Sequence, residues 1–592
     1  MQVASRPAPI DVITRPIWFA PFLLACATAL SYFYADRTMP VPDEGALLVA
    51  AGKILHGGVF YRDIDAYAFP GVSYLLAGFM SIFGEHLSVA RGVAGAIYCV
   101  TLLGVYASAV TLMNPRRAAL CGLSLLSLKF FAFPIYTMFF YADASVAAAI
   151  LALALFLRHR FDGGTSARLF GVGVLAGLSI ATKQSTGILV AFVFALVLVF
   201  PAFAHGPRRR DGRLLEVAGY GAGLFLVIAG MSIYFASHGV FNDMIRGGLL
   251  RPFTGYLPTS GVSFAPPISW WNFGALKSQA LVYYPQAYLE LALNATRPGD
   301  GARLFYLQFG EVIVRVLYSV IPILFLACAG LWIRAWRRNP VGNIDAGKSD
   351  AEISGPDEES AFSRARFFST AGITLAIVVS AFPRADFIHI ITTYPAVALI
   401  GFALCRPSML GRSGTGGDAP TSTIQTRRLH IEAALVILLL ASTSFFAIRY
   451  DATLSHRLSI ERAEVWVRPR DAWLAPMVRY VQDKIPKGES FFVYGHEAHW
   501  YYLTDRYTER TFSQLYPGMT GDEDGAQLAK MIRETRPRVI AQGVLRWPGT
   551  PSLPRYTGKL RRTLKELYEL DPDAIKDPPI PRIMSLWRLR EG

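Results

Sequence analysis

The chain has 592 residues, of which 53% are hydrophobic and only 17% are charged, and its mean hydropathy is +0.35. Soluble proteins carry about 25% charged residues, so this composition excludes a water-soluble enzyme as well as a disordered or fibrous chain. The net charge of +15 falls mostly in short clusters between apolar segments. That placement is typical of cytoplasmic loops and argues against nucleic acid as a partner.

Apolar windows close to the roughly 20 residues that a membrane helix needs recur up to residue 450. We expect about eleven crossings, near residues 17–35, 87–113, 118–136, 144–157, 167–184, 186–204, 214–237, 311–333, 367–382, 388–405 and 430–448. No small-residue cleavage site follows the first window, so it predicts a retained anchor. All five cysteines lie in apolar runs without a CxxC pair, which indicates neither a disulfide framework nor a thiolate metal site.

The positive-inside rule settles two ambiguous stretches. Residues 70–84 are apolar but short, and a crossing there would put Arg116 and Arg117 outside, so we expect a re-entrant or interfacial segment. The apolar run 167–204 has basic flanks on both sides and must cross twice, with its turn at Lys183. The protein is therefore predicted to be a multi-pass protein of the cytoplasmic (inner) membrane, with its N-terminus inside.

The extramembrane parts give the domain organisation. We expect an all-α polytopic membrane domain over residues 1–448, with outer loops at about 36–85 and 237–311, and an extracytoplasmic α/β domain over 449–592. The second loop is rich in aromatic residues, including Trp270 and Trp271, and is predicted to line a surface cavity. The tail alternates predicted helices and strands, with helices at 474–484, 525–535 and 560–570 and strands at 490–494, 538–541 and 584–587.

Two short motifs are interpreted as accidental. Residues 342–349 fit GxxxxGK[ST], but they follow a membrane helix rather than a β-strand, so backbone amides would not be aimed at phosphate. His496 and His499 are three residues apart, whereas HExxH needs histidines four apart on one helix face. A surface role is the better interpretation for the second motif, with a secondary metal contact as the alternative.

Basic residues at the predicted outer boundary are the informative feature. Ionisable groups near membrane depth are costly unless they act in function, and the residues in question are Arg91, Lys129, Lys183, Arg384 and His389. Each could be a snorkelling side chain, but together they favour an anionic ligand such as a lipid phosphate. Asp43 with Glu44, and Asp143 in the next loop, supply acids beside them, although Asp43 and Asp143 could instead cap helices.

An ordered set of short motifs carries a family resemblance. The set comprises Asp43-Glu44-Gly, Gly57-Gly58, Tyr61-Arg62-Asp63, Pro70-Gly71, Phe83-Gly84, Arg91, Tyr141-Ala-Asp143, Lys183-Gln184, Arg384-Ala-Asp386-Phe-Ile-His389 and Tyr501 to Arg506. It resembles the GT-C superfamily of membrane glycosyltransferases, in particular bacterial enzymes related to the protein O-mannosyltransferases and the lipid A aminoarabinose transferases. Ala68-Phe69 stands where paired prolines are often found, which leaves the shape of the first outer loop open.

The resemblance implies transfer of a sugar from a polyprenyl-phosphate donor to a lipid, glycan or protein acceptor of the cell envelope, with inversion. It maps the catalytic base onto Asp43, with Glu44 beside it and Asp143 as the second acid. It maps the donor-phosphate contacts onto Arg91, Lys129, Lys183, Arg384 and His389, and leaves Tyr61, Asp63 and Asp65 as further loop candidates. No divalent metal is expected, because several cations already face a monophosphate leaving group.

Two other function classes remain open. A transporter or flippase of lipid-linked saccharides would need charges along a path through the bilayer rather than at one boundary. A lipid-linked glycan ligase or polymerase would share the outer cations but use a diphosphate donor.

Overall fold

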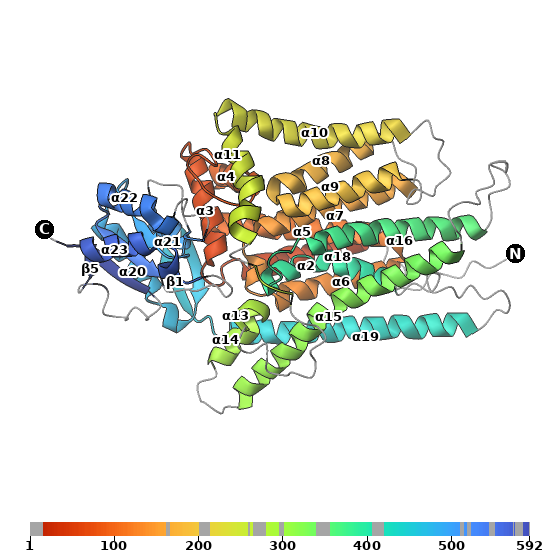
Figure 1. The fold of residues 1–592 in the computed structure, drawn as a ribbon. Helices are drawn as coiled ribbons and strands as arrows, with labels where there is room; N and C mark the ends of the chain where they lie inside the picture. The colour runs from red at the N-terminus through yellow and green to blue at the C-terminus, as the bar shows by residue number, and fades with distance from the viewer. Residues whose placement is uncertain are drawn as a thin grey trace.

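The computed structural model describes most of the chain. The described residues are 16–161, 166–200, 213–257, 261–264, 280–294, 301–338, 356–404, 420–508, 514–517, 523–543, 551–571, 574 and 584–590. Helices run side by side through the larger part of the molecule, and a smaller part with strands covers one end of them (Figure 1). We call that end of the helix bundle the capped end.

A helix lies over every predicted crossing. These helices are α2 (Pro16–Tyr34), α5 (Leu87–Leu112), α6 (Pro115–Phe131), α7 (Tyr141–Phe161), α8 (Ser166–Thr182), α9 (Gln184–Val199), α10 (Arg213–Ser237), α15 (Gly301–Arg338), α16 (Pro356–Val379), α18 (Tyr394–Leu404) and α19 (Pro420–Asp451). Among the described residues, six of them are long and apolar enough to cross a membrane by length and composition. The helical membrane fold is thus confirmed, while eleven crossings stays a prediction.

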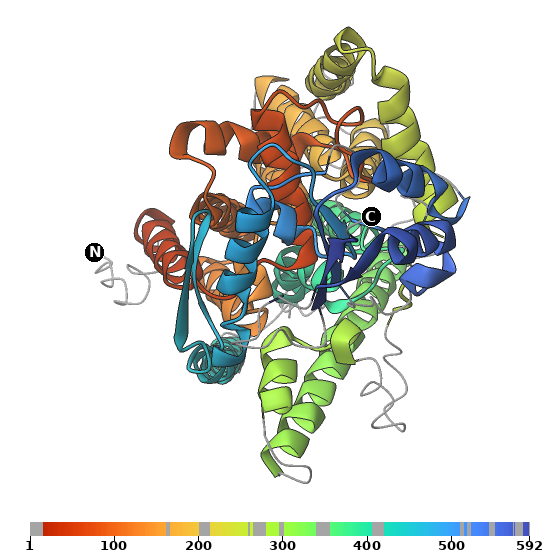
Figure 2. The same ribbon diagram turned by 90° about the vertical axis from the view of Figure 1, so that its left-hand side faces the viewer.

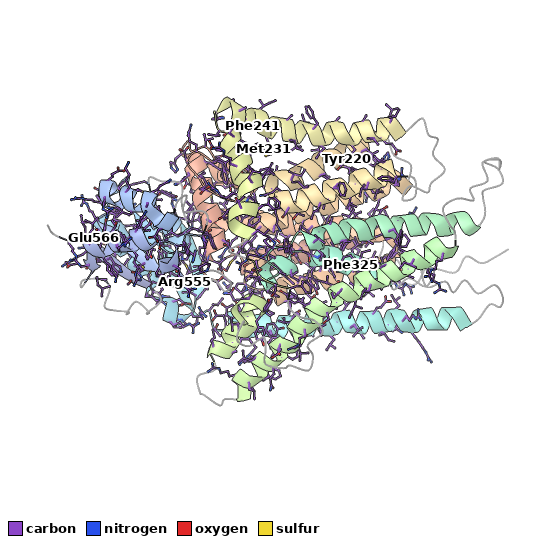
Figure 3. All side chains as sticks on the ribbon, in the orientation of Figure 1. Tyr220, Met231, Phe241, Phe325, Arg555 and Glu566 are labelled. Carbon is purple, nitrogen blue, oxygen red and sulfur yellow. The ribbon has the colours of Figure 1, made fainter. Side chains whose placement is uncertain are left out.

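Several of these helices present large apolar side chains to their surroundings. Phe225 of α10 is 70% exposed, Leu326 of α15 is 72% exposed and Leu438 of α19 is 65% exposed. Figure 3 shows such side chains along the outer faces of the bundle, whereas the labelled Arg555 and Glu566 lie in the part with strands. Apolar surface of this extent requires an apolar solvent, which the acyl chains of a bilayer provide.

Short helices gather at the capped end. They are α3 (Pro42–Leu55), α4 (Gly71–Phe83), α11 (Phe241–Ile245), α13 (Ala280–Tyr283) and α14 (Gln286–Asn294), with two π-helical turns, η4 (Arg246–Leu250) and η5 (Pro252–Tyr256). Figure 2 looks onto this end and shows α3 close to the strands. α4 has 13 residues, fewer than the roughly 20 that a crossing requires, and the interfacial placement of residues 70–84 stays a prediction. The two tryptophans predicted to line a cavity, Trp270 and Trp271, lie outside the described residues.

The C-terminal part has the predicted α/β character. Helices α20 (Leu474–Lys484), α22 (Ala526–Thr535) and α23 (Gly558–Leu567) accompany strands β3 (Phe492–Tyr494), β4 (Val539–Gly543), β5 (Tyr568–Leu570) and β6 (Met584–Leu589). The strand order is β3-β4-β6-β5, with β3 and β4 parallel and the other pairs antiparallel. The three helices and the strands β3, β4 and β6 overlap the segments predicted from the tail sequence. The helix predicted at 560–570 is wrong at its end, because residues 568–570 form β5 and pair with β6.

One hairpin was not predicted. Strands β1 (His456–Ile460) and β2 (Ala463–Val467) pair antiparallel directly after α19. The chain after α2 joins them, because Thr38 N donates to Trp466 O at 2.9 Å and Trp466 N donates to Asp36 O at 2.7 Å. The hairpin therefore connects the C-terminal part to the beginning of the first loop.

The C-terminal part shares an apolar core with the first loop. Leu48 of α3 and Leu76 of α4 belong to the same buried cluster as Val465 and Trp500. A Cβ at Gly45 would lie 2.4 Å from the backbone nitrogen of His499, so only glycine permits this approach of α3 to α21 (His499–Thr504). The division at residue 448 stays a prediction along the chain, while in space the two parts pack as one body at the capped end.

Candidate active site

Asp43 lies in the first turn of α3, where Pro42 begins the helix and an acidic residue is favoured by the helix dipole. Its carboxyl group interacts electrostatically with Arg384, His389 and Asp386 and is hydrogen-bonded to the Gln514 side chain. Burial raises the pKa of Asp43, and His389 and Arg384 oppose that rise. The structure thus brings together two predicted site elements that are more than three hundred residues apart, Asp43 and the Arg384–His389 turn.

The Arg384–His389 turn is organised by Asp386. Its carboxylate accepts from Arg384 Nε at 3.0 Å and from the backbone nitrogen of His389 at 3.1 Å, capping the short helix α17 (Phe387–Ile391). His389 Nδ1 lies 2.6 Å from Asp386 Oδ1. Burial would raise the pKa of Asp386, but His389 and Arg384 outweigh it and lower the pKa to about 2. An ionised carboxylate only accepts, so Nδ1 of His389 carries the proton.

Lys183 comes from the predicted turn between α8 and α9, and the structure places that turn as expected. Its Nζ donates to Ser380 O at 3.2 Å, the side chain is buried, and it interacts electrostatically with Asp143 and Asp386. A lysine held by a single carbonyl keeps donor capacity. Lys183 therefore stands between the two acidic groups of the site.

Asp143 lies in the first turn of α7 and interacts electrostatically with Lys129 and Lys183. Its Oδ1 is buried and has no hydrogen-bond partner among the described residues. A cavity of about 10 Å³ beside it is lined in part by Tyr136 and Thr392, and such a volume is about the size of one water molecule. The unused acceptor atom would be satisfied by a water or by a hydroxyl group of a ligand.

Glu44 and Arg91 form a closed pair instead of facing a ligand. Both side chains are 0% exposed, and Arg91 Nη2 lies 3.2 Å from Glu44 Oε2. Arg91 Nη1 also donates to the carbonyls of Ala35 at 3.0 Å and Arg37 at 2.6 Å, and Glu44 Oε1 accepts from Phe139 N at 3.0 Å. The donors of Arg91 are thus engaged by protein atoms in this structure, and the phosphate contact expected for Arg91 stays a prediction. Through these contacts Glu44 holds the first outer loop against Arg91 and Phe139.

Lys129 is also enclosed by protein atoms. Its Nζ donates to Tyr136 O at 2.8 Å and lies 4.9 Å from the centre of the Tyr98 ring, and the residue is 1% exposed. Lys129 also interacts electrostatically with Asp143, and the phosphate contact expected for Lys129 stays a prediction.

The remaining candidates, Tyr61, Asp63 and Asp65, make contacts that stabilise the conformation of the first loop. Asp63 accepts from Val59 N at 2.7 Å and Asp65 pairs with Arg251 of the second loop. Tyr61 has a φ of +70°, and its hydroxyl donates to Ala68 O at 3.3 Å. These contacts shape the loop and do not bring the three side chains to Asp43.

Two glutamines that the sequence analysis did not single out as site residues tie the site together. Gln514 Nε2 donates to Pro42 O at 2.9 Å and to His496 O at 3.3 Å. Gln184, next to Lys183, donates to Gly248 O at 2.7 Å and accepts from Phe69 N at 3.1 Å. Asp386 was likewise not a candidate, although it stands between Arg384 and His389 in the quoted motif. A buried amide on a loop leaves no periodic signal in a sequence.

The HExxH-like segment does not form a metal-binding helix face, because α21 begins only at His499. Burial lowers the pKa of His496 to about 4 and that of His499 to about 3, so both are neutral at pH 7. Within the described ranges no group of three or more His, Cys, Asp or Glu side chains could hold a metal ion. The P-loop-like residues 342–349 lie outside the described residues.

Comparison with known proteins gives one family. Residues 68–234 match the family model of dolichyl-phosphate-mannose-protein mannosyltransferase. The matched segment includes Arg91, Lys129, Asp143 and Lys183 and leaves out Asp43 and Arg384. No curated protein matches the sequence.

Several solved structures are similar at low sequence identity. ArnT from Cupriavidus metallidurans bound to undecaprenyl phosphate is 12% identical, with a TM-score of 0.46 over 97% of this chain and 98% of that chain. The oligosaccharyltransferase AglB from Archaeoglobus fulgidus, in complex with an inhibitory peptide and a dolichol-phosphate, is 11% identical, with a TM-score of 0.48 over 96% of this chain and 75% of that chain. Likenesses of this size carry no argument about activity. The family match confirms the predicted resemblance to GT-C glycosyltransferases over residues 68–234.

Proposed function

We propose that the protein is a glycosyltransferase that moves a hexose or pentose from a polyprenyl-phosphate donor to a hydroxyl group of a lipid, glycan or protein acceptor. The observation that carries the proposal is the meeting of Asp43 with Arg384 and His389 at the capped end, with Lys183 close by. An acid beside clustered cations at the end of a membrane bundle suits a reaction in which a hydroxyl loses a proton while a phosphate departs.

The reaction follows from these groups. Asp43 accepts the proton of the acceptor hydroxyl as that oxygen attacks the anomeric carbon. The bond between the anomeric carbon and the phosphate oxygen breaks on the opposite face, so the configuration inverts. Lys183 and Arg384 stabilise the departing polyprenyl phosphate, and Asp386 holds His389 beside them through His389 Nδ1. Asp143 keeps Lys183 oriented within the site.

The location of the reaction is part of the proposal. Helix ends that carry arginine lie away from the capped end (Figure 1). They are the start of α10 with Arg213, the end of α15 with Arg334 and Arg337, and the first half of α19 with Arg427 and Arg428. By the positive-inside rule that end faces the cytoplasm. The capped end, with Asp43 and the C-terminal part, then faces outward from the cytoplasmic membrane, where envelope glycans are assembled.

The placement of the charges favours an enzyme over a transporter. Asp43, Lys183 and Arg384 belong to helix ends and turns at the capped end. A translocation path would instead need ionisable groups near the middle of the membrane helices.

The test is transfer by the purified full-length protein in detergent or nanodiscs. Undecaprenyl-phosphate sugars labelled in a hexose or a pentose are incubated with lipid and glycan acceptors, and labelled product is followed together with the anomeric configuration. We expect inverted product from a monophosphate donor. Turnover only of diphosphate-linked donors would identify a ligase or polymerase, and movement of label across vesicles without product would identify a transporter. A parallel reaction in EDTA reports whether a divalent metal is needed.

A further inference from the structure

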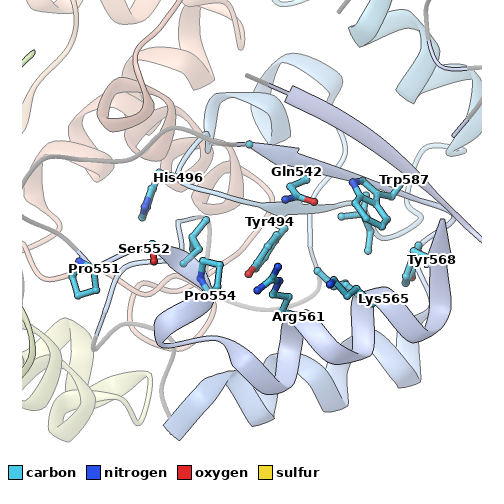
Figure 4. A pocket seen from close by; sticks show the side chains of 14 residues that line it. Tyr494, His496, Gln542, Pro551, Ser552, Pro554, Arg561, Lys565, Tyr568 and Trp587 are labelled. Carbon is cyan, nitrogen blue, oxygen red and sulfur yellow. The ribbon is translucent and has the colours of Figure 1, made fainter. Parts of the chain in front are cut away.

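The C-terminal part contains a cavity of about 420 Å³ that the proposed transfer reaction does not use. It lies between the strands β3, β4 and β6 on one side and α23 on the other, and Figure 4 shows the side chains that line it. This volume falls within the range of about 300–1,000 Å³ that is usual for small-molecule sites.

Three aromatic rings line the cavity and have their polar atoms engaged. Tyr494 Oη lies 2.9 Å from Thr557 Oγ1, and Tyr568 Oη donates to Pro537 O at 2.9 Å. Trp587 Nε1 donates to Ser585 Oγ at 3.0 Å. Because each ring already satisfies its polar group, what it contributes to the cavity is its carbon surface. Such surfaces suit the flat C–H faces of a ligand ring.

Two cations stand on the α23 side of the cavity. Arg561 and Lys565 are one helical turn apart, both are exposed, and both line the cavity. In the part of the chain that the structure describes, no carboxylate pairs with either of them, whereas Arg562 lies 3.8 Å from Asp524 and Arg533 lies 3.2 Å from Glu566. A shallower cavity of about 310 Å³ beside the first is lined by the same two residues. The charges are available to an anionic group.

Polar groups at the other side of the cavity can recognise hydroxyls. Gln542 lines it with its side-chain amide, and His496, which is 2% exposed, has a buried Nδ1 without a hydrogen-bond partner among the described residues. His496 O accepts from Gln514, whose amide also binds Pro42 O, next to Asp43. Gln514 thus links one side of the cavity to the candidate catalytic base.

We propose that this cavity binds an anionic sugar unit of the acceptor, with the sugar ring against Tyr494 and Trp587 and its phosphate or carboxylate on Arg561 and Lys565. The inference rests on the proposed function and names its acceptor class, a glycan or glycolipid that carries a negative charge. A purely apolar chain would leave Gln542 and His496 unsatisfied, and an inorganic anion would leave the three rings unused.

The test is direct binding to the full-length protein in nanodiscs, measured by isothermal titration calorimetry. The probes are glucose 1-phosphate, glucuronate, glucose and inorganic phosphate. We expect the two anionic sugars to bind about 10-fold more tightly than glucose or phosphate, because both the ring and the charge are recognised. The double variant Arg561→Gln with Lys565→Gln should reduce the affinity for the two anionic sugars to the affinity for glucose. Trp587→Leu should weaken the binding of all three sugars. Lys559 is exposed on the same helix, and the control variant Lys559→Gln should leave every affinity unchanged.

Equal binding of glucose and glucose 1-phosphate would overturn the proposal, as would binding that the double variant leaves unchanged. Phosphate that binds as tightly as the anionic sugars, with no effect of Trp587→Leu, would identify a plain anion site and overturn it as well. Melting temperatures of the variants, compared with Lys559→Gln, separate lost binding from lost folding.

Failure of the proposed function is a separate result. The binding measurement needs no donor and stands even if no sugar is transferred. Conversely, transfer to an anionic acceptor with an unchanged KM in the double variant would end the inference and leave the glycosyltransferase intact.

Discussion

Adjacent acids in the first turn of α3 have opposite surroundings. Glu44 is 0% exposed and is matched by Arg91 and the Phe139 amide. Asp43 faces a turn that carries Arg384, His389 and the carboxylate of Asp386, and it is hydrogen-bonded by Gln514 from the C-terminal part. A carboxylate whose hydrogen bonds and counter-charge all come from its fixed neighbours, such as Glu44, stabilises the fold. A carboxylate that competes with another acid for the same basic side chains, such as Asp43, can take part in a reaction. Matched substitutions at the two acids test that distinction.

Neutralising Asp43 should give the largest loss of activity. Asp43→Asn keeps the shape of the side chain and removes the proton acceptor, so kcat should fall by about 10²–10⁴-fold. The melting temperature should stay within a few degrees of wild type, because burial already disfavours the charged form of Asp43. Transfer rates and melting curves on the same detergent-purified samples check both expectations. An Asn variant with wild-type kcat would remove Asp43 from the base role.

Neutralising Glu44 should reduce the stability of the fold more than the rate of transfer. Glu44→Gln leaves the Arg91 guanidinium buried without its counter-charge, which should cost about 3 kcal/mol or more in free energy of unfolding. Thermal melting and the yield of folded protein measure the loss. The double variant Glu44→Gln with Arg91→Met removes both charges and should recover much of the stability. If Glu44→Gln were as stable as Asp43→Asn, the comparison between the two acids would fail.

Lys183 should affect the donor more than the fold. Its Nζ donates to Ser380 O at 3.2 Å, and a charge-assisted bond to phosphate is worth about 1.5–3 kcal/mol. Lys183→Gln should therefore lower kcat/KM for the polyprenyl-phosphate donor by about 10- to 100-fold. Arg427→Gln, an exposed charge on α19, is the matched control and should leave the value unchanged. A Lys183 variant that alters only the acceptor KM would place the donor phosphate elsewhere.

The smallest expected effect is a pH dependence of stability in the C-terminal part. Burial lowers the pKa of His499 from 6.5 to about 3. Below pH 6.5 the unfolded chain takes up a proton that the folded chain refuses, so stability is complete above pH 6.5 and declines as the pH falls toward 3. By pH 5 this histidine should cost about 2 kcal/mol.

Melting curves between pH 7.5 and pH 5 measure that decline. His496, whose pKa burial lowers to about 4, contributes with the same sign. The variant His499→Gln should therefore remove about half of the slope, by the same linkage. An unchanged slope in His499→Gln would show that another group controls the acid sensitivity.

Local sequence patterns predicted the helices and most strands because each carries its own periodicity. The helix predicted at 474–484 coincides with α20, and the turn predicted at Lys183 separates α8 from α9. The β1–β2 hairpin was missed although Leu458 and Ile460 of β1, and Ala463, Val465 and Val467 of β2, are buried in alternation with more exposed residues. That alternation is the signal of a half-buried strand, so the hairpin was open to prediction from the sequence.

The candidate site was predictable only in part. Asp43, Lys183, Arg384 and His389 could be singled out as candidates because charge is unusual at a membrane boundary. The same signal grouped Arg91 with them, since nothing in its neighbourhood reveals a partner 47 residues earlier in the chain. Gln514 was invisible for the same reason, because its contacts with Pro42 exist only after the C-terminal part has packed on α3.

The tight approach at Gly45 has a consequence for the engineering of this protein. The backbone of His499 occupies the space that a side chain at position 45 would need. α3 and the C-terminal part must therefore be exchanged together. A chimaera that received a foreign tail while keeping its own α3 would lose the geometry that aims Asp43, however well each half folded alone. Acceptor preference in such hybrids should therefore be altered by grafting both segments together.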